Sequence, residues 1–264
     1  MDTVVYTVKN RVATIRIARE EKLNAITADM YAEILRLMKQ AEADDDVGAI
    51  ILTGTGTKAF SAGTDITKMG SKGQVEANGV TRPKTKADRL VGGKKIQETM
   101  KGIEHLKKPV IAAMNGLAAG GGFELALSCD IRIASDTAFF FFPEVSYGIM
   151  PGSGGSQRLT RISGIAVCKY MSFTCERVYA EKAKEFGIVT EVLPSDKLMP
   201  RAIEMAERIA SYPASGLALC KDAIYRGAQV PLEEGLYIEE RNFVDCYDYP
   251  AAFAGIDKFN NRKK

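Results

Sequence analysis

The pattern of apolar and polar positions predicts a chain of mixed strands and helices with a helical C-terminal part. Val4–Val8 and Val12–Ile17 alternate with period two around a short polar turn, which is typical of a β-hairpin with one buried face. The apolar residues that follow recur at helical spacing as far as about Ala43, with Thr27 as the N-cap. The chain is therefore predicted to begin with a hairpin and an amphipathic helix.

The same criteria predict the remaining elements in a mixed order up to Pro194. Strands are predicted at Val47–Thr53, Val110–Met114, Ile131–Ala134, Ala138–Phe142 and Ile188–Leu193. Helices are predicted at Ala87–Leu106, Phe123–Cys129 and Ala180–Phe186, with short helices after the glycine-rich stretch 148–155 and further helices at about 197–212, 214–227, 231–246 and 249–260. Residues 67–86 are rich in Gly, Lys, Thr and Asn without periodicity, which indicates a long loop.

Composition limits the class of protein. The chain has 264 residues, of which 46% are hydrophobic and 26% charged, as expected of a globular domain with a substantial core. The net charge of +3 argues against a dedicated nucleic-acid binder. The longest apolar uncharged stretch, Pro109–Phe123, is shorter than the ~20 residues of a membrane-spanning helix, and the N-terminal residues lack a signal-peptide pattern. We therefore expect a cytoplasmic protein that does not insert into a membrane.

The few histidines and cysteines restrict the chemistry. Five cysteines without C-x-x-C spacing are expected to be reduced and mostly in the core. The single histidine, His105, rules out a multi-histidine metal site and is expected to be structural near a helix end. Acid–base chemistry in this chain must therefore rest mainly on carboxylates.

Two carboxylates stand in suggestive surroundings. Glu124 follows Gly120-Gly121-Gly122-Phe123, where glycines leading into a helix leave unpaired N–H groups that suit a developing oxyanion. Glu144 follows Pro143 and four consecutive phenylalanines, Phe139–Phe142, which are expected to be buried on both faces, so that desolvation favours its protonated form. The alternative interpretations are a tight turn with a first-turn glutamate and an exposed loop glutamate after a core strand.

Two further motifs are less informative by themselves. Pro151–Arg158 is glycine-rich but lacks the Lys-Ser/Thr ending of a P-loop and the G-x-G-x-x-G spacing, so a nucleotide site is not indicated. Ala59–Asp65 is a small-residue turn after a strand. The absence of G-x-S-x-G leaves a serine hydrolase without support.

Taken together, these motifs resemble the enoyl-CoA hydratase/isomerase, or crotonase, superfamily. The resemblance is carried by 52–66, 107–116, 120–125 and 143–152, which occur in the family's order. It implies an α/β fold: a crotonase-like spiral of ββα units over residues 1–195, followed by a helical C-terminal region over 196–264 that packs homotrimers or hexamers made of two trimers.

The resemblance also implies roles for individual residues. The backbone N–H groups of Thr64 and Gly121 would form an oxyanion hole for the thioester oxygen. Glu124 and Glu144 match the two glutamates that flank a water in hydratases, with Glu144 exchanging a proton with the substrate, Glu124 holding the water, and the backbone at Gly152 helping to position it. An enoyl-CoA hydratase, which adds water reversibly and with syn geometry to a 2-enoyl-CoA, is therefore the first hypothesis.

The acyl-CoA substrate itself supplies coenzyme A, so no separate cofactor and no metal are implied. By the resemblance, CoA is expected along Leu23, Ala62, Thr64, Asp65, Ile66 and Gly121, with Lys22, Lys68 or Lys258 near its phosphates. Many hydratases carry Ala where this chain has Thr64, which leaves the acyl group open, because a β-branched side chain narrows the thioester slot or adds a hydroxyl.

Two alternatives remain open. One keeps the fold and changes the reaction to double-bond isomerisation or another conversion of a CoA thioester through an enolate. The other is RNA binding by a basic surface made of the lysines at 68, 72, 84, 86, 94, 95, 107 and 108. The small net charge and the absence of an RNA-binding motif argue against the second alternative.

Overall fold

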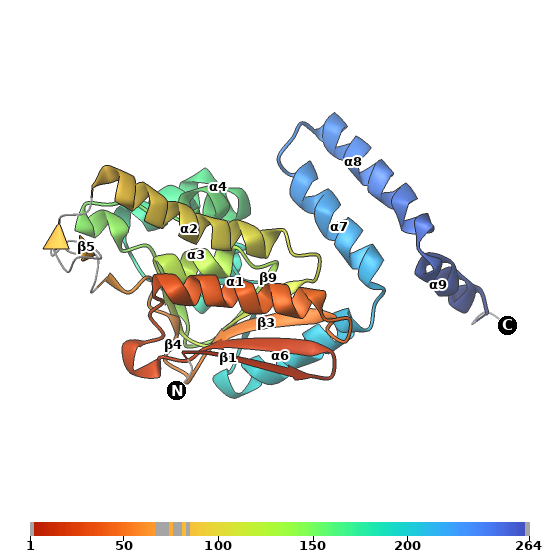
Figure 1. Ribbon diagram of the computed structural model, residues 1–264, viewed down its shortest axis with the longest axis horizontal. Helices are drawn as coiled ribbons and strands as arrows, with labels where there is room; N and C mark the ends of the chain where they lie inside the picture. Colours follow the sequence, from red (N-terminus) through yellow and green to blue (C-terminus); the bar gives the residue numbers. More distant parts are fainter. Residues whose placement is uncertain (1–2, 67–73, 76–80, 83–84, 262–264) are drawn as a thin grey trace.

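Two packed β-sheets form the centre of the molecule, and a group of helices extends away from them (Figure 1). The computed structural model describes residues 3–66, 74–75, 81–82 and 85–261. The larger sheet has the order β1 (Val4–Lys9), β2 (Val12–Ile17), β3 (Ala49–Gly54), β7 (Val110–Met114), β9 (Ile131–Ser135) and β12 (Glu191–Leu193). β1 pairs antiparallel with β2, and the other neighbours are parallel.

The smaller sheet has the order β11 (Val178–Tyr179), β10 (Phe139–Phe141), β8 (Leu117–Ala119) and β4 (Ala59–Ser61). β4, β8 and β10 are parallel to one another, and β11 is antiparallel to β10. A separate antiparallel pair consists of β5 (Gln74–Val75) and β6 (Thr81–Arg82). Most of the loop predicted over 67–86 lies outside the described residues.

The helices are α1 (Ala28–Ala43), α2 (Lys86–Glu104), α3 (Gly121–Leu127), α4 (Gly155–Thr174), α5 (Ala180–Glu185), α6 (Ser195–Ala210), α7 (Ala214–Gly227), α8 (Leu232–Asp245) and α9 (Pro250–Asn261). Short 3-10 turns are η1 (Glu20–Lys22), η3 (Glu144–Tyr147) and η4 (Cys246–Asp248). The Thr27 side chain accepts a hydrogen bond from the Met30 N–H, which confirms the predicted N-cap of the first helix.

The large sheet is covered on both faces, which explains why its central strands are apolar throughout. Ile50 and Leu52 of β3 face the core shared with α1, α2 and the smaller sheet, whereas Ile51 faces α6. All six residues of β3 are buried as a result. This is the pattern of parallel strands with helices on each side.

An aromatic cluster fixes α3 against the smaller sheet. The ring of Phe123 lies 5.6 Å from that of Phe140 and 5.0 Å from that of Phe142. Burial on both faces was expected for all four phenylalanines; Phe140 and Phe142 are fully buried, whereas Phe139 and Phe141 on the other face are only half-buried. Their face of β10 is partly open to solvent. The guanidinium of Arg177 lies over it, 5.0 Å from the centre of the Phe139 ring.

The short helices expected after residue 155 are confirmed, because α4 consists of two helical segments that meet at Gly164, whose φ of 85° and ψ of 163° are not helical. Two other predictions need correction. The strand β8 was not predicted, because its three residues follow the Asn-Gly turn too closely to show alternation. Of the five free cysteines, only Cys129 and Cys168 are buried.

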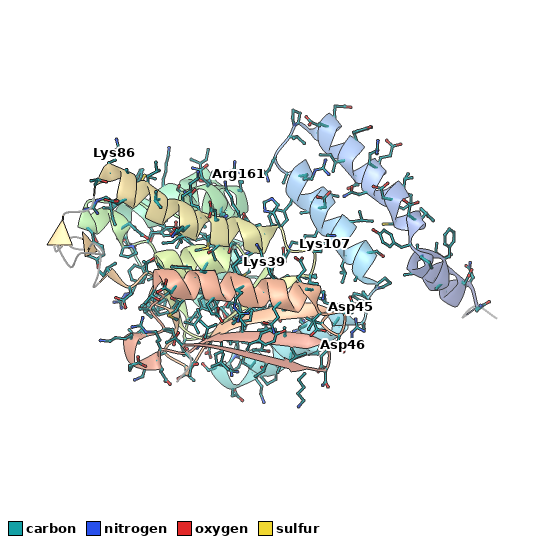
Figure 2. All side chains as sticks on the ribbon, in the orientation of Figure 1. Lys39, Asp45, Asp46, Lys86, Lys107 and Arg161 are labelled. Atoms are coloured by element: carbon teal, nitrogen blue, oxygen red, sulfur yellow. The ribbon has the colours of Figure 1, made fainter. Side chains whose placement is uncertain are left out.

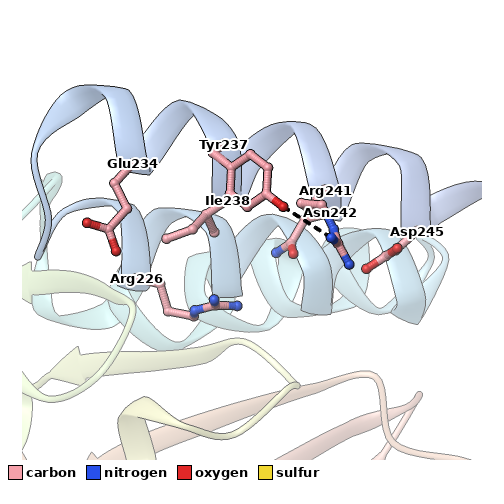
Figure 3. A pocket seen from close by; sticks show the side chains of 7 residues that line it. All are labelled: Arg226, Glu234, Tyr237, Ile238, Arg241, Asn242 and Asp245. Atoms are coloured by element: carbon pink, nitrogen blue, oxygen red, sulfur yellow. Dashed lines mark hydrogen bonds between the residues drawn. The ribbon is translucent and has the colours of Figure 1, made fainter.

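The last three helices, α7, α8 and α9, lie apart from both sheets (Figure 1). α6 packs on the large sheet, but α7, α8 and α9 project beyond it. α7 and α8 pack side by side and border a groove of about 290 Å³ (Figure 3). Its lining is mostly polar and includes Arg226, Glu234, Tyr237, Arg241 and Asp245. In the described part of the chain, no helix is long and apolar enough to cross a membrane.

The aromatic cluster yields a prediction about stability. Phe123→Ala should lower the free energy of unfolding by about 3–5 kcal/mol, because it removes a fully buried ring and leaves a cavity beside Phe140 and Phe142. Phe173→Ala, at a site that is 70% exposed, should change it by less than about 1 kcal/mol. Urea unfolding followed by circular dichroism measures both, and equal losses would contradict the assignment of the ring to the core.

Candidate active site

The candidate site is built where two backbone segments approach very closely. One segment follows β4 and contains Gly63, and the other joins β8 to α3. A side chain at Gly63 would come within 2.6 Å of the Ala119 carbonyl oxygen, and one at Gly122 within 2.5 Å of the Ser61 carbonyl oxygen. Gly63 also has φ +99°, where other residues are strained. Glycine is therefore required at both positions for the two segments to meet.

This approach places the N–H groups of Thr64 and Gly121 beside each other. A Cβ atom on Gly121 would lie 3.3 Å from the Thr64 nitrogen, and one on Gly63 would lie 3.2 Å from the Gly121 nitrogen. Within the described residues, neither N–H group donates a hydrogen bond. Two adjacent unused donors are an arrangement that can stabilise negative charge on a bound oxygen.

Glu124 is held firmly in the first turn of α3. Its side chain is 2% exposed, and its Oε1 accepts hydrogen bonds of 2.8 Å from the N–H groups of Ser153 and Gly155. Burial raises the pKa of this carboxyl, and the two backbone donors and the nearby Arg158 oppose that rise. The loop before α4 thus fixes one oxygen of Glu124.

That loop is itself held by an ion pair that the sequence did not reveal. The Arg158 guanidinium contacts the Glu104 carboxylate at 2.6 and 2.7 Å and donates to the Ser153 carbonyl oxygen at 2.8 Å. Gln97 of α2 donates to the Gly152 carbonyl oxygen. Because Glu104 and Arg158 are 54 positions apart, no local pattern could have paired them.

Glu144 occupies a different environment. It begins η3, and its Oε1 lies 2.8 Å from the position that a Cβ on Gly120 would take. Its Oε2 is buried and has no hydrogen-bond partner among the residues that the structure describes. Burial raises the pKa of Glu144 to about 7, and the charge of Glu124 contributes to that rise. The expectation of a desolvated carboxyl is confirmed, and the two glutamates are close enough to interact electrostatically.

Tyr31 is a site residue that the sequence analysis did not single out. It lies in α1 and is 1% exposed, and its phenol oxygen is 3.1 Å from the Thr64 Oγ1. Its pKa is raised by burial and further by the charges of Glu124 and Glu144. Its helical spacing with Ile34 and Met38 is that of an ordinary core residue, so only the fold reveals its position.

The residues expected along CoA lie together beside this centre. The Ala62 N–H donates to the Leu23 carbonyl, Ile26 bonds to both Gly63 and Asp65, and the Asp65 carboxylate pairs with Arg19 at 3.1 Å. Leu23 and Ile66 present exposed apolar side chains. These contacts join residues 23–26 to residues 62–66 in one continuous strip, which includes the Thr64 amide.

The lysines proposed for phosphate contacts are placed less uniformly. Lys22 is exposed in η1, next to Leu23. Lys68 lies outside the described residues. Lys258 belongs to α9, which projects away from the body that contains α3 (Figure 1). Of these three lysines, Lys22 is the one that the described part of the chain places beside the strip.

Among the described lysines of the RNA-binding alternative, Lys108 does not contribute to a basic surface. Lys108 directs its ammonium to the carbonyl oxygens of Ala41 and Asp44, so it stabilises a loop. Lys86 and Lys107 project outward, with Asp45 and Asp46 on the surface of the same body (Figure 2). Lys68, Lys72 and Lys84 lie outside the described residues. His105 is the C-cap of α2, with its Nδ1 2.6 Å from the Lys101 carbonyl oxygen, as expected of a structural residue.

The chain is similar in sequence to known enoyl-CoA hydratases. The chain is 38% identical over 264 residues to a short-chain-enoyl-CoA hydratase of Clostridium acetobutylicum, covering 100% of this chain and 97% of that protein. It is 35% identical to a mitochondrial enoyl-CoA hydratase of Pongo abelii, covering 97% and 83% of the two chains.

Solved structures show the same fold. An enoyl-CoA hydratase subunit of Geobacillus kaustophilus matches with a TM-score of 0.90 at 36% identity, covering 100% of this chain and 96% of that one. An enoyl-CoA hydratase of Bacillus anthracis matches with a TM-score of 0.89 at 34% identity, covering 99% and 97%. The enoyl-CoA hydratase/isomerase family model matches residues 7–264. The chain therefore has the crotonase fold, with two mixed sheets and a helical C-terminal region, and belongs to the enoyl-CoA hydratase/isomerase family.

Proposed function

We propose that this chain is an enoyl-CoA hydratase, which adds water reversibly to the double bond of a 2-enoyl-CoA thioester. The observation that carries the proposal is the meeting of two carboxyls, Glu124 and Glu144, beside two N–H donors that have no partner in the described structure. Hydration needs one group to deprotonate water and one to protonate the α-carbon, together with stabilisation of an enolate oxygen. This site offers all three.

The thioester oxygen accepts hydrogen bonds from the Thr64 and Gly121 N–H groups in this mechanism. Negative charge grows on that oxygen as the hydroxyl adds to the β-carbon, so donors already in place stabilise the transition state more than the substrate. Loss of one such donor typically raises the barrier by about 2.7–4 kcal/mol. The adenine nucleotide and pantetheine of CoA then extend along the strip of Leu23, Ala62, Asp65 and Ile66.

The two glutamates divide the proton transfers. Glu124 is fixed by Ser153 and Gly155 and orients the water. Glu144 exchanges the proton with the substrate, because its pKa of about 7 lets it exist in both protonation states near neutral pH. In the hydration direction, the Glu124 carboxylate takes a proton from the water as the water oxygen bonds to the β-carbon, and protonated Glu144 gives its proton to the α-carbon.

Substitution of either glutamate tests the proposal directly. Glu124→Gln and Glu144→Gln should each lower kcat for hydration of crotonyl-CoA by about 10²–10⁴-fold, because each removes one acid–base group. The loss of absorbance of the conjugated thioester measures the rate. Glu98→Gln, on the exposed face of α2, is the matched control and should retain wild-type activity.

The outcome also separates the related reactions. Wild-type protein that leaves crotonyl-CoA unchanged but converts a 3-enoyl-CoA to its 2-enoyl isomer would replace the hydratase with an isomerase. Full hydratase activity in either glutamine variant would contradict the proposed roles. Straight-chain, branched and cyclic 2-enoyl-CoA thioesters tested in parallel define the acyl group.

The raised pKa of Glu144 predicts how stability depends on pH. A carboxyl whose pKa is raised on folding favours the folded state when protonated, so this contribution is lost as the pH rises from about 4.5 through about 7. Glu144→Gln avoids the loss. At pH 8 it should therefore be more stable than the wild type by about 1–2 kcal/mol, after a discount for partial exposure, and equal to it near pH 4.5. Thermal unfolding at both pH values measures this, and a gain independent of pH would contradict it.

We propose further that residues 196–264 carry self-association into a trimer or a pair of trimers. Large apolar side chains remain exposed on this region, namely Leu232, Leu236, Phe243, Val244, Phe253, Ile256 and Phe259. Phe243→Asp should lower the mass measured by light scattering, because a charge in an apolar interface is costly. Leu90→Asp, at an equally exposed position on α2, should leave the mass unchanged. A monomeric wild type would overturn this assignment.

A further inference from the structure

A pair of hydroxyl groups lies directly against the two unused amides. The phenol of Tyr31, from the core-facing side of α1, and the Thr64 Oγ1 are 3.1 Å apart. They come from positions 33 residues apart in the chain. Within the described residues, each has the other as its hydrogen-bonding partner.

The pair also packs on Gly121. A Cβ atom at Gly121 would lie 2.5 Å from the Tyr31 phenol oxygen and 2.5 Å from the Thr64 Oγ1. The two oxygens therefore fill the space where any side chain would project from this residue. One hydroxyl belongs to Thr64 itself, and both hydroxyls pack against Gly121. The pair therefore touches both of the peptide segments that carry the N–H donors.

The hydrogen bond orients both side chains. A buried phenol needs a hydrogen-bonding partner, and the Thr64 Oγ1 is the partner available to Tyr31 within the described residues. Burial raises the pKa of Tyr31, the hydrogen bond with Thr64 lowers it, and the charges of Glu124 and Glu144 raise it further. Either hydroxyl can donate, and in both cases the bond restrains the side-chain rotamer of Thr64.

We infer that the Tyr31 and Thr64 hydroxyls form a positioning unit that holds the Thr64 and Gly121 N–H groups in register for the developing enolate oxygen. The inference rests on the proposed function, because it takes these amides as donors to the thioester oxygen. Donors that need no rearrangement stabilise the transition state most, and small displacements of aligned groups reduce the rate strongly. Neither hydroxyl transfers a proton in this role.

The test uses variants that remove a hydroxyl and keep the shape. Tyr31→Phe and Thr64→Val each delete one member of the pair, Thr64→Ser retains the hydroxyl, and a double variant removes both. Tyr6→Phe is the matched control, because the Tyr6 phenol oxygen is also buried and has no hydrogen-bond partner in the structure. Thermal unfolding is recorded for every variant.

The expected result is a loss in kcat rather than a rise in KM. Tyr31→Phe and Thr64→Val should each lower kcat for crotonyl-CoA by roughly 10- to 100-fold, with KM within about threefold of the wild type. The double variant should be little worse than either single one, because the hydroxyls act as a unit. Thr64→Ser should recover most of the activity, and Tyr6→Phe should match the wild type.

A second readout does not need turnover. Butyryl-CoA labelled with ¹³C at its carbonyl has no double bond to hydrate, and its infrared carbonyl band should shift to lower frequency on binding to the wild type. Tyr31→Phe should show a smaller downshift. If the wild type shows the downshift but hydrates no enoyl-CoA, the proposed reaction fails while the positioning role stands.

Other outcomes would overturn the inference. It fails if Tyr31→Phe has the wild-type kcat and carbonyl band, if the loss appears only in KM, or if activity follows the melting temperature across the variants. It also fails if Thr64→Ser is as impaired as Thr64→Val. No downshift in the wild type would overturn the inference together with the proposed oxyanion site.

Discussion

The close contact between the segment after β4 and the segment before α3 is the constraint on which the site depends. At Gly63 and Gly122 any side chain would collide with a backbone carbonyl of the other segment. The contact leaves the N–H groups of Thr64 and Gly121 adjacent and unused. It is maintained by the parallel pairing of β4 with β8 and by the aromatic cluster that presses α3 onto β10. The donors are therefore a property of the packed backbone, and side-chain substitution alone cannot recreate them elsewhere.

The two glutamates differ in their hydrogen bonding: Glu124 has backbone partners for its carboxylate, whereas one carboxylate oxygen of Glu144 has none in the described structure. Glu124 receives two backbone hydrogen bonds and lies near Arg158, and these partially offset the cost of its burial. Glu144 has one buried oxygen without a partner and a neighbour of like charge. Burial raises the pKa of both carboxyls, and at Glu124 the two backbone donors and Arg158 oppose the rise. The asymmetry argues for a fixed carboxylate at Glu124 and a proton-exchanging group at Glu144.

The sequence predicted the parts of the site that consist of neighbouring residues in the chain. The glycine run before Glu124 and the apolar strand before Glu144 both carry local signals, and burial raises the pKa of Glu144 in the direction expected from the sequence. Tyr31 could not be found in this way, because a phenol at a core position of an amphipathic helix looks like any other buried aromatic residue.

The parts that depend on distant pairing were missed for a similar reason. The link between Arg158 and Glu104 spans 54 positions, and the Ser153 and Gly155 amides reach Glu124 across 29 and 31 positions. The β8 strand is too short for its periodicity to be seen. Local pattern identifies helices and strands well, but contacts between elements are set by the topology of the two sheets.

The C-terminal helices raise a separate question of stability, since they bury little of their apolar surface. α7 is connected to the main body by a mostly buried ion pair, in which the Lys221 ammonium lies 2.8 Å from the Asp130 carboxylate, and the same carboxylate oxygen accepts from the Val110 N–H of β7. One such pair adds little net stability once desolvation is counted, although it fixes orientation. Phe243 of α8 and Phe253 of α9 are exposed, and these helices need an apolar surface to cover them. Asp130 directly precedes β9 of the large sheet, so the ion pair ties the orientation of α7 to the large sheet, whereas the Gly121 amide follows β8 of the smaller sheet.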